Sequence, residues 1–504
     1  MNQGTGTTAT RTEVTTYKNY IGGSWVASRT GRTFESRNPA HKDQVIGVLQ
    51  QSDARDVDAA ISAAEKAFPG WRKTPAPARG EICLRAGLLL EQRKESLARL
   101  MTQEMGKVLK EARGDVQEAI DMAKYAAGMG RRPQGETVPS ELKDKWCMTV
   151  RDPLGVVGCI TPWNFPMAIP SWKIFPALMA GNTVVFKPAS DTPIMATKLV
   201  EIFEEAGLPG GVLNLVTGSA AEAGDPLVKD PRVRGISFTG STAAGKQIAE
   251  YCGRTLKRVG LELGGKNCIV VLDDADLSLA VDGALWAAFG TSGQRCTAAS
   301  RLIVEKKVEG EFTERLADRA RRMKVGDGLN PDTDMGPVIN ESALKKVHDY
   351  TQVGKQDRAR LITGGDFASP DGWFYQPTIF ADGRKEMRIA QEEIFGPSTL
   401  VMPVSDLDEA LTVANSTEYG LSMSIYTNDL RKAFAAMEQM QSGIVYVNAP
   451  TIGAEIQLPF GGVKNTGNGH REAGTVALDE FTEWKTIYVD YSGRLQRAQI
   501  DTGE

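Results

Sequence analysis

Histidine and cysteine are scarce in this chain of 504 residues, which has three His and six Cys. No two cysteines form a C-x-x-C pair and no H-E-x-x-H sequence occurs, so neither a zinc site nor a thioredoxin-like motif is expected. Scattered cysteines in a long chain favour reduced thiols over a disulfide framework. We therefore expect a cytoplasmic protein with no metal site, and a catalytic base other than histidine.

Long apolar runs and an excess of one charge are also missing. No stretch has 18 consecutive apolar residues, so a membrane-spanning helix is not expected. The first dozen residues are polar, which argues against a secretory signal, and we expect residues 1–12 to form a flexible tail. Lys and Arg number 59 against 63 Asp and Glu, a net charge of −4, which gives no support for a nucleic-acid or membrane partner.

Apolar periodicity divides the chain into a helical first part and two blocks of alternating strands and helices. Up to about residue 132 the pattern is mostly helical, over 54–68, 78–104 and 106–129, and residues 133–151 are polar and broken, typical of an arm or linker. This alternation predicts an α/β fold with parallel sheets in two domains and a cleft between them. The expected strands are 155–160, 183–186, 212–216, 235–238 and 260–263, then 268–272, 302–304, 400–403, 422–426 and 444–447.

Two short stretches carry residues suited to covalent catalysis. In TSGQRCT, Cys296 lies among small polar residues where a thiol can be exposed, and Arg295 beside it would favour the thiolate. Burial in the core is the commoner fate of a free cysteine, and we expect it for the other five. In LELGGKN, Glu262 lies between two leucines at a strand end, so its pKa should rise into the range of a general base. The alternative is a Glu paired with a nearby Lys or Arg.

Three further stretches follow apolar strands, where ligands bind in open α/β sheets. ITPWNFP contains Asn164, whose amide suits an oxyanion donor, although such a residue is more often a helix cap. FTGSTAAG, which begins at Phe238, runs through a turn into a helix whose N-terminus can bind an anion. KPAS, which begins at Lys187, follows another strand, and its lysine is also typical of a solvated strand end.

Six motifs occur in one order along the chain, namely WNFP, FTGS, ELGG, GQ-x-C, EIFGP and PFGG. With them the chain resembles the NAD(P)-dependent aldehyde dehydrogenase superfamily, from about Tyr17 to Asp490. The resemblance implies a Rossmann-like cofactor domain (13–132 and 153–262), an α/β catalytic domain (263–474) and a small β oligomerisation arm (133–152 and 475–495). It also implies a homo-oligomer, a dimer or a tetramer. An exposed final strand with Phe481, Trp484, Ile487 and Val489 would suit cover by a partner subunit.

The resemblance also implies roles for single residues. Cys296 matches the nucleophile, Glu262 the base that hydrolyses the thioester, and Asn164 with the Cys296 N–H the oxyanion donors, while Lys173 and Glu472 match a proton relay. The implied cofactor is NAD or NADP, and Ser190, where NAD-restricted members carry Glu, predicts that NADP is accepted. The implied cofactor-binding residues are Ile160, Thr161, Pro162, Trp163, Asn164, Lys187, Ser190, Gly218, Gly224, Phe238, Gly240, Ser241, Leu263, Glu393 and Phe395.

The nearest branches are the α-aminoadipic semialdehyde and α-ketoglutaric semialdehyde (2,5-dioxovalerate) dehydrogenases. They imply a small-molecule semialdehyde that bears a carboxylate, which Arg295 would contact unless it pairs with Glu118 or Asp121. The implied substrate residues are Arg295, Glu118, Thr297, Gly453 and Ala454. Two alternatives are a CoA-acylating semialdehyde dehydrogenase, which Glu262 disfavours, and an idle structural member, which the presence of Cys296, Glu262 and Asn164 disfavours.

Overall fold

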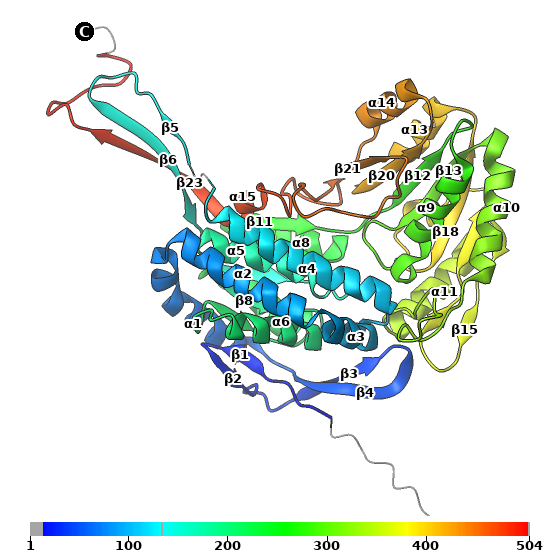
Figure 1. Cartoon of the computed structure of the whole chain (residues 1–504), viewed down its shortest axis with the longest axis horizontal. Helices are drawn as coiled ribbons and strands as arrows, with labels where there is room; N and C mark the ends of the chain where they lie inside the picture. The colour runs from blue at the N-terminus through cyan, green and yellow to red at the C-terminus, as the bar shows by residue number, and fades with distance from the viewer. Residues whose placement is uncertain (1–13, 133–134, 502–504) are drawn as a thin grey trace, which may run out of the picture.

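The computed structural model describes residues 14–132 and 135–501, so the expected tail and Pro133 lie outside the described residues. Two α/β bodies lie side by side, and a long β arm projects from the first (Figure 1). Within the described residues, no helix is long and apolar enough to cross a membrane. In the same part of the chain, no group of three or more His, Cys, Asp or Glu is arranged to hold a metal ion.

The first body is built on a seven-stranded sheet in the order β11-β10-β7-β8-β9-β1-β2. Five strands run parallel and confirm the expected ones: β7 (Val156–Ile160), β8 (Thr183–Lys187), β9 (Leu213–Leu215), β10 (Val233–Thr239) and β11 (Arg258–Glu262). They are buried almost throughout, because helices cover both faces of the sheet. These helices are α1 (Ala54–Lys73), α2 (Ala76–Gln92), α3 (Lys94–Met105), α4 (Leu109–Met129), α5 (Ala168–Ala180), α6 (Pro193–Glu205), α7 (Asp225–Lys229) and α8 (Thr242–Thr255).

Four strands lie in a region that the sequence predicts as mostly helical, and there the prediction is wrong. β1 (Asn19–Ile21) and β2 (Ser24–Val26) extend the first sheet in antiparallel fashion. β3 (Thr33–Asn38) and β4 (His41–Gln50) form a separate hairpin. The hairpin exposes many of its residues and carries few apolar ones, so its alternating pattern is weak in the sequence.

The expected helix 78–104 is two helices, and the next one starts later than expected. Arg93, with φ −100° and ψ 5°, separates α2 from α3. Apolar spacing continues across this break because both helices pack on the same core. Gly106 ends α3 with φ +92°, and a Cβ there would lie 2.8 Å from Pro337 Cγ, so the chain turns at this glycine before α4 begins.

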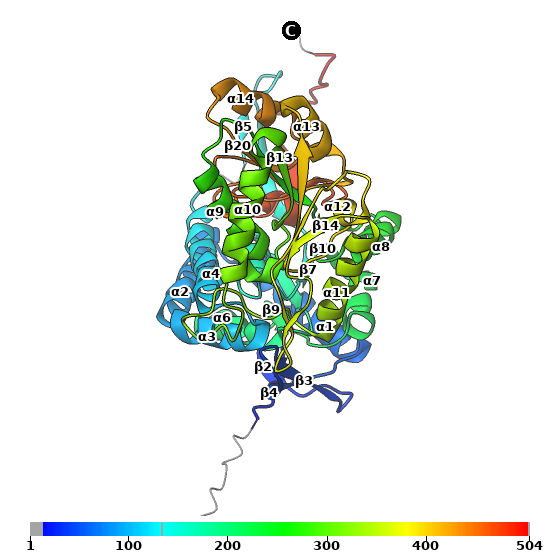
Figure 2. The same ribbon diagram turned by 90° about the vertical axis from the view of Figure 1, so that its right-hand side faces the viewer.

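The second body contains a sheet in the order β14-β17-β18-β13-β12-β20-β21. The five expected strands are present as β12 (Asn267–Val271), β13 (Ala299–Glu305), β18 (Ser398–Val404), β20 (Ser422–Tyr426) and β21 (Ile444–Val447). α9 (Leu277–Phe289) and α10 (Lys306–Arg322) lie on one side of it, and α11 (Glu341–Gln356) and α12 (Arg388–Gln391) on the other (Figure 2). The sequence predicts none of the helices of this body, nor its remaining strands. The elements not yet described are β14 (Arg360–Thr363), β15 (Phe367–Ser369), β16 (Phe374–Tyr375), β17 (Thr378–Ala381), α13 (Leu407–Asn415), β19 (Tyr419–Gly420), α14 (Leu430–Gln439) and β22 (Val463–Lys464).

The arm is a three-stranded antiparallel sheet in the order β23-β6-β5. β23 (Thr482–Asp490) pairs with β6 (Lys145–Pro153) along its whole length, and β5 (Thr137–Val138) adds a short edge. Trp484 is 55% exposed and Val489 45%, as the strand pattern predicts. Phe481, expected in the exposed strand, is instead buried in the short helix α15 (Ala477–Phe481), which anchors the arm in the core.

Candidate active site

The loop that carries Cys296 is held in an unusual backbone conformation. Thr291, Ser292 and Gly293 follow one another with positive φ angles of 53°, 55° and 69°. Strain of this kind persists only where surrounding contacts impose it, and it gathers at functional sites. After the turn, Asn267 Nδ2 donates to the Cys296 carbonyl at 2.7 Å. The loop therefore presents Cys296 in one fixed position.

The Cys296 thiol is only partly buried, whereas the other five cysteines are buried, as expected. Burial, followed by the nearby carboxylates of Glu262, Glu393 and Glu472, raises the pKa of this thiol to about 12. The expectation that Arg295 favours the thiolate is therefore wrong, since carboxylates dominate the field at the sulfur. The thiol must lose its proton to a base as it reacts.

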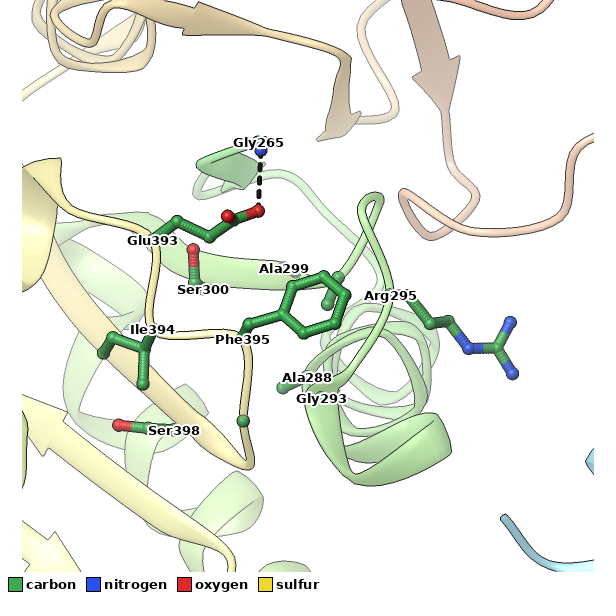
Figure 3. Close-up of a pocket in the computed structure, with 12 residues that line it drawn as sticks. Gly265, Ala288, Gly293, Arg295, Ala299, Ser300, Glu393, Ile394, Phe395 and Ser398 are labelled. Carbon is green, nitrogen blue, oxygen red and sulfur yellow. Dashed lines mark hydrogen bonds between the residues drawn. The ribbon is translucent and has the colours of Figure 1, made fainter. Parts of the chain in front are cut away.

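Arg295 points away from the thiol because its guanidinium is held by a different cluster. Its Nη2 lies 3.3 Å from Glu111 Oε1, and its Nε donates to Thr291 Oγ1 at 3.0 Å. The guanidinium also lies 5.2 Å from the ring centroid of Phe165 and 5.9 Å from that of Trp286. Figure 3 shows the side chain extending away from Glu393 and Phe395. The ion pair considered for Arg295 is formed with Glu111 and not with Glu118 or Asp121.

Glu262 ends strand β11 as a buried carboxylate. Burial raises its pKa well above the usual range, and the charge of Glu472 adds to this effect. Its Oε2 has no hydrogen-bond partner, and it forms no ion pair within the described part of the chain. Gly461, at φ +149°, leaves room for the other oxygen, because a Cβ there would collide with Glu262 Oε1. An unpaired, desolvated carboxylate in the same cavity as Cys296 has the properties of a general base.

Asn164 lies directly against the Cys296 loop. Its Nδ2 donates to the Gln294 carbonyl at 3.0 Å, while its buried Oδ1 has no partner. Asn164 and Cys296 line one cavity of about 680 Å³. The hydrogen bond to Gln294 fixes the amide in the cavity that Cys296 also lines, and its second N–H suits an oxyanion donor.

Lys173 and Glu472 form a buried ion pair next to Glu262. Burial disfavours the Lys173 ammonium, but the Glu472 and Glu480 carboxylates outweigh this effect and leave its pKa raised. Lys173 Nζ also donates to Ser237 Oγ at 2.9 Å. The two expected relay residues are in direct contact.

All five expected substrate residues meet in one cavity of about 590 Å³. Glu118 is half-buried there, and burial, with the nearby Asp115, raises its pKa to about 8 against the opposing charge of Arg295. Aromatic and aliphatic side chains form the remaining wall between Arg295 and Cys296. The lining residues are Glu118, Phe165, Ile169, Trp172, Thr239, Glu262, Leu263, Arg295, Cys296, Thr297, Leu421, Gly453, Ala454, Phe460 and Glu472.

The cavity that contains Asn164 opens on the other side of Cys296. Glu393 Oε1 accepts the Gly265 N–H at 2.9 Å (Figure 3). The Phe395 ring meets that of Trp163 edge-on, with centroids 5.5 Å apart. Ser241 caps α8 by accepting the Ala244 N–H at 3.3 Å. The expected cofactor residues that line this cavity are Pro162, Trp163, Asn164, Gly240, Ser241, Leu263, Glu393 and Phe395.

The other expected cofactor residues lie at or just after the C-terminal ends of strands β7 to β10. Lys187 is buried at the end of β8, where burial lowers its pKa to about 8 against the opposing charge of Asp191. Ser190 Oγ donates to the Gly218 carbonyl at 3.0 Å, and Gly224 is buried in the turn after β9. A dinucleotide fits these residues, because a helix N-terminus and a buried cation suit its phosphates. The buried strand-end residues are Ile160, Thr161 and Phe238.

Several polar residues near the site were missed by the sequence analysis. Glu111 holds Arg295, and Lys346 lines the cofactor-side cavity. Lys107 and Asp115 form a fully buried ion pair beside Phe165. Glu111 and Glu118 lie seven residues apart, two turns of one helix, so their shared face could have been read from helical spacing. For Lys346 there was no local signal.

A partly exposed cysteine and an unpaired buried carboxylate share one cavity, beside strand ends that suit a dinucleotide. The profile of the aldehyde dehydrogenase family matches residues 25–487. The chain belongs to this family and is an NAD(P)-dependent aldehyde dehydrogenase, as the six ordered motifs predict.

Individual relatives are similar over nearly their whole length. The chain is 42% identical to an α-ketoglutaric semialdehyde dehydrogenase of Bacillus subtilis over 482 residues, covering 95% of this chain and 99% of the relative. It is 44% identical to a 2,5-dioxopentanoate dehydrogenase of Saccharolobus solfataricus over 467 residues, covering 92% and 97%. The structure of a Staphylococcus aureus betaine aldehyde dehydrogenase in complex with NAD+ superimposes with a TM-score of 0.93 at 35% identity, covering 95% of each chain.

Proposed function

We propose that the enzyme oxidises a semialdehyde with a distal carboxylate to the corresponding acid. The observation that carries this proposal is that Arg295, whose guanidinium is held on Glu111, and Cys296 line the same largely apolar cavity. An aldehyde at the thiol would place a carboxylate at the far end of a short chain near the guanidinium, which suits carboxylates. The names of the Bacillus and Saccharolobus relatives support the same substrate class.

In the first step Cys296 is the nucleophile. Its Sγ attacks the aldehyde carbon while the thiol proton passes to a carboxylate, and Glu262 is the unpaired one in this cavity. The C=O electron pair moves to oxygen, which the Asn164 amide and the Cys296 N–H stabilise. A bound nicotinamide dinucleotide supplies the hydride acceptor, and hydride loss leaves a thioester on Cys296.

Hydrolysis of the thioester is the role of Glu262. Once Glu262 has passed the thiol proton to the neighbouring Glu472, it accepts a proton from a water that attacks the carbonyl carbon. The C–S bond then breaks, its electron pair returns to Sγ, and the thiolate takes up a proton. The raised pKa of Glu262 suits a group that must accept a proton near neutral pH. Lys173 and Glu472 lie where they can carry the proton away. With this base present, CoA is not needed to release the acid.

The cofactor is NAD or NADP, and acceptance of NADP is part of the proposal. Ser190 is small and neutral, and its hydroxyl donates to Gly218 without filling the space that a glutamate would occupy. Lys187 nearby can pair with a 2′-phosphate, and no carboxylate at position 190 repels it.

The domain roles and the assembly belong to the same proposal. Residues 13–132 and 153–262 would form the cofactor domain, 263–474 the catalytic domain, and 133–152 with 475–495 the oligomerisation arm. Exposed Trp146, Trp484 and Tyr488 on the arm support a cytoplasmic dimer or tetramer in which a partner subunit covers them.

The test compares a carboxylate-bearing semialdehyde with an aldehyde of equal chain length that lacks the carboxylate. The purified enzyme, without CoA, should reduce NAD+ and NADP+ with both, and kcat/KM should be higher for the carboxylate substrate. Equal kcat/KM values would contradict the substrate class, and a requirement for CoA would contradict hydrolysis.

A further inference from the structure

Thioester hydrolysis on Glu262 leaves a proton on a carboxylate that is almost completely buried. Glu262 is only 5% exposed. Each turnover must remove this proton before the next water can be activated, so the buried groups around Glu262 decide how fast the base is regenerated. This argument rests on the proposed function, in which Glu262 is that base.

Strands β10 and β11 place two layers of polar groups on one face of the sheet. Ser237 pairs with Gly260, and Thr239 with Glu262, in parallel register. Side chains two residues apart on a strand point to the same face, so these two pairs are successive rungs roughly 6.6 Å apart. The rung at the strand ends contains the base, and the rung below it lies deeper in the body.

Lys173 joins the two rungs. Its Nζ is paired with Glu472, which also accepts a hydrogen bond from Thr239 Oγ1 at 3.4 Å on the upper rung. The same Nζ donates to Ser237 Oγ at 2.9 Å on the lower rung. The Lys173 ammonium can therefore give a proton to the lower rung and take one from Glu472, which regenerates the ammonium.

Glu480 is the carboxylate of the lower rung. It comes from α15, is 4% exposed, and lies near Ser237, which favours its charged form and lowers its pKa. A Cβ on Gly260 would collide with Glu480 Oε1, so the glycine is what lets this carboxylate reach the strand. That oxygen has no hydrogen-bond partner. A buried, unpartnered carboxylate oxygen carries a desolvation cost that packing alone does not explain.

We propose that Glu480 is the acceptor of the lower rung: it receives a proton from Lys173 by way of Ser237 while Glu472 delivers the proton from Glu262 to the same ammonium, and it passes the proton on toward the root of the arm. Each transfer breaks one O–H or N–H bond and forms another, so no oxidant or co-reactant is required. Glu480 touches neither substrate nor cofactor and acts through Lys173, so it is a positioning residue. Asp479, its exposed neighbour on α15, pairs with Arg151 and lines a cavity at the base of the arm that Glu480 does not line.

The titration of Glu480 fits this role and involves several elements. Burial raises its pKa to about 7, with Lys173 opposing and Glu472 adding to the shift. Arg258 on β11 also lowers the pKa of Glu480. The Cys159 thiol on β7 is close enough for the charge of Glu480 to raise its pKa. A carboxyl that titrates near neutral pH can both accept and release a proton during turnover.

The test is Glu480→Gln in the full-length enzyme, with Asp479→Asn as the matched control on the same short helix. The first-turnover burst of reduced cofactor should keep its rate, while the steady-state rate should fall roughly tenfold, a part of what a positioned proton-transfer group contributes. The solvent isotope effect on the steady state should increase. Because a negative charge near Glu262 is lost, the acidic limb of the pH profile should move to lower pH. Glu480→Asp should restore part of the rate, and Asp479→Asn should resemble the wild type.

Two outcomes would overturn the proposal. If Glu480→Gln slows the burst and the steady state by the same factor, the residue only supports the fold. If the substitution changes neither rate, Glu480 has no part in proton release. Glu262→Gln, measured in parallel, separates this failure from that of the proposed function. If Glu262→Gln selectively slows the steady state and Glu480→Gln does not, only the role of Glu480 is wrong. If Glu262→Gln fails to slow the steady state, the base assignment itself is wrong.

Discussion

Arg295 adjoins Cys296 in the sequence, yet its guanidinium lies on Glu111, 3.3 Å away, and not on the thiol. The nucleophile therefore gains nothing from its cationic neighbour, and the cation remains at the wall of the substrate cavity. This separation lets one short loop supply both the reactive atom and a candidate anchor for the far end of the substrate.

Arg295→Ala should lower kcat/KM for a carboxylate-bearing semialdehyde. The decrease should correspond to roughly 2–4 kcal/mol of lost transition-state stabilisation, the scale of a lost charge-assisted pair. The same change should cost much less with a plain aldehyde such as hexanal, which serves as the internal control. Steady-state kinetics with both substrates measure the difference. Equal losses for the two substrates would mean that Arg295, through Glu111 and Thr291, only supports the nucleophile loop.

Glu118 should make substrate affinity depend on pH. Its pKa is raised to about 8, so the carboxyl is mostly neutral at pH 7 and becomes anionic as pH rises through that value. The anion would repel a substrate carboxylate, so KM for the semialdehyde should increase above about pH 8 while that for hexanal stays flat. In Glu118→Gln this increase should disappear. An identical KM profile in the variant would show that another group is responsible.

Cofactor preference should respond to position 190. Ser190→Glu should shift the ratio of kcat/KM values from NADP toward NAD by on the order of tenfold or more, about 1.4 kcal/mol, through repulsion of the 2′-phosphate. Ser190→Gln has a side chain of the same size without the charge and is the control. A wild-type enzyme that does not turn over NADP+ would contradict the prediction.

The buried pair Lys107–Asp115 should be a large stability determinant. Asp115 Oδ2 lies 2.9 Å from Lys107 Nζ, and its Oδ1 accepts the Ala168 N–H at 2.7 Å, which caps α5. Asp115→Ala leaves a buried ammonium unpaired and should cost roughly 3–5 kcal/mol of unfolding free energy, measured by urea denaturation. Adding Lys107→Met should recover part of this loss, and a double variant as unstable as the single one would contradict the ion-pair account.

Much of the fold was predictable because parallel strands are apolar throughout and alternate with amphipathic helices. Ten expected strands are present, and all five expected substrate residues meet in one cavity. What the sequence could not show depends on partners distant in the chain. The pKa of Cys296 is raised first by burial and then by Glu262, Glu393 and Glu472, which only folding brings together. The hairpin β3–β4 was missed because its strands are largely exposed.

The most direct test of the account is to trap the acyl-enzyme. Glu262→Gln is mixed with a carboxylate-bearing semialdehyde and NADP+ or NAD+, and reduced cofactor and intact protein mass are followed in time. The account predicts a burst near one equivalent of reduced cofactor per site, a steady state slowed by roughly a hundredfold or more, and an acyl adduct on Cys296 that Cys296→Ala does not form. A variant in which the burst is lost in step with the steady state, with no adduct on Cys296, would contradict it.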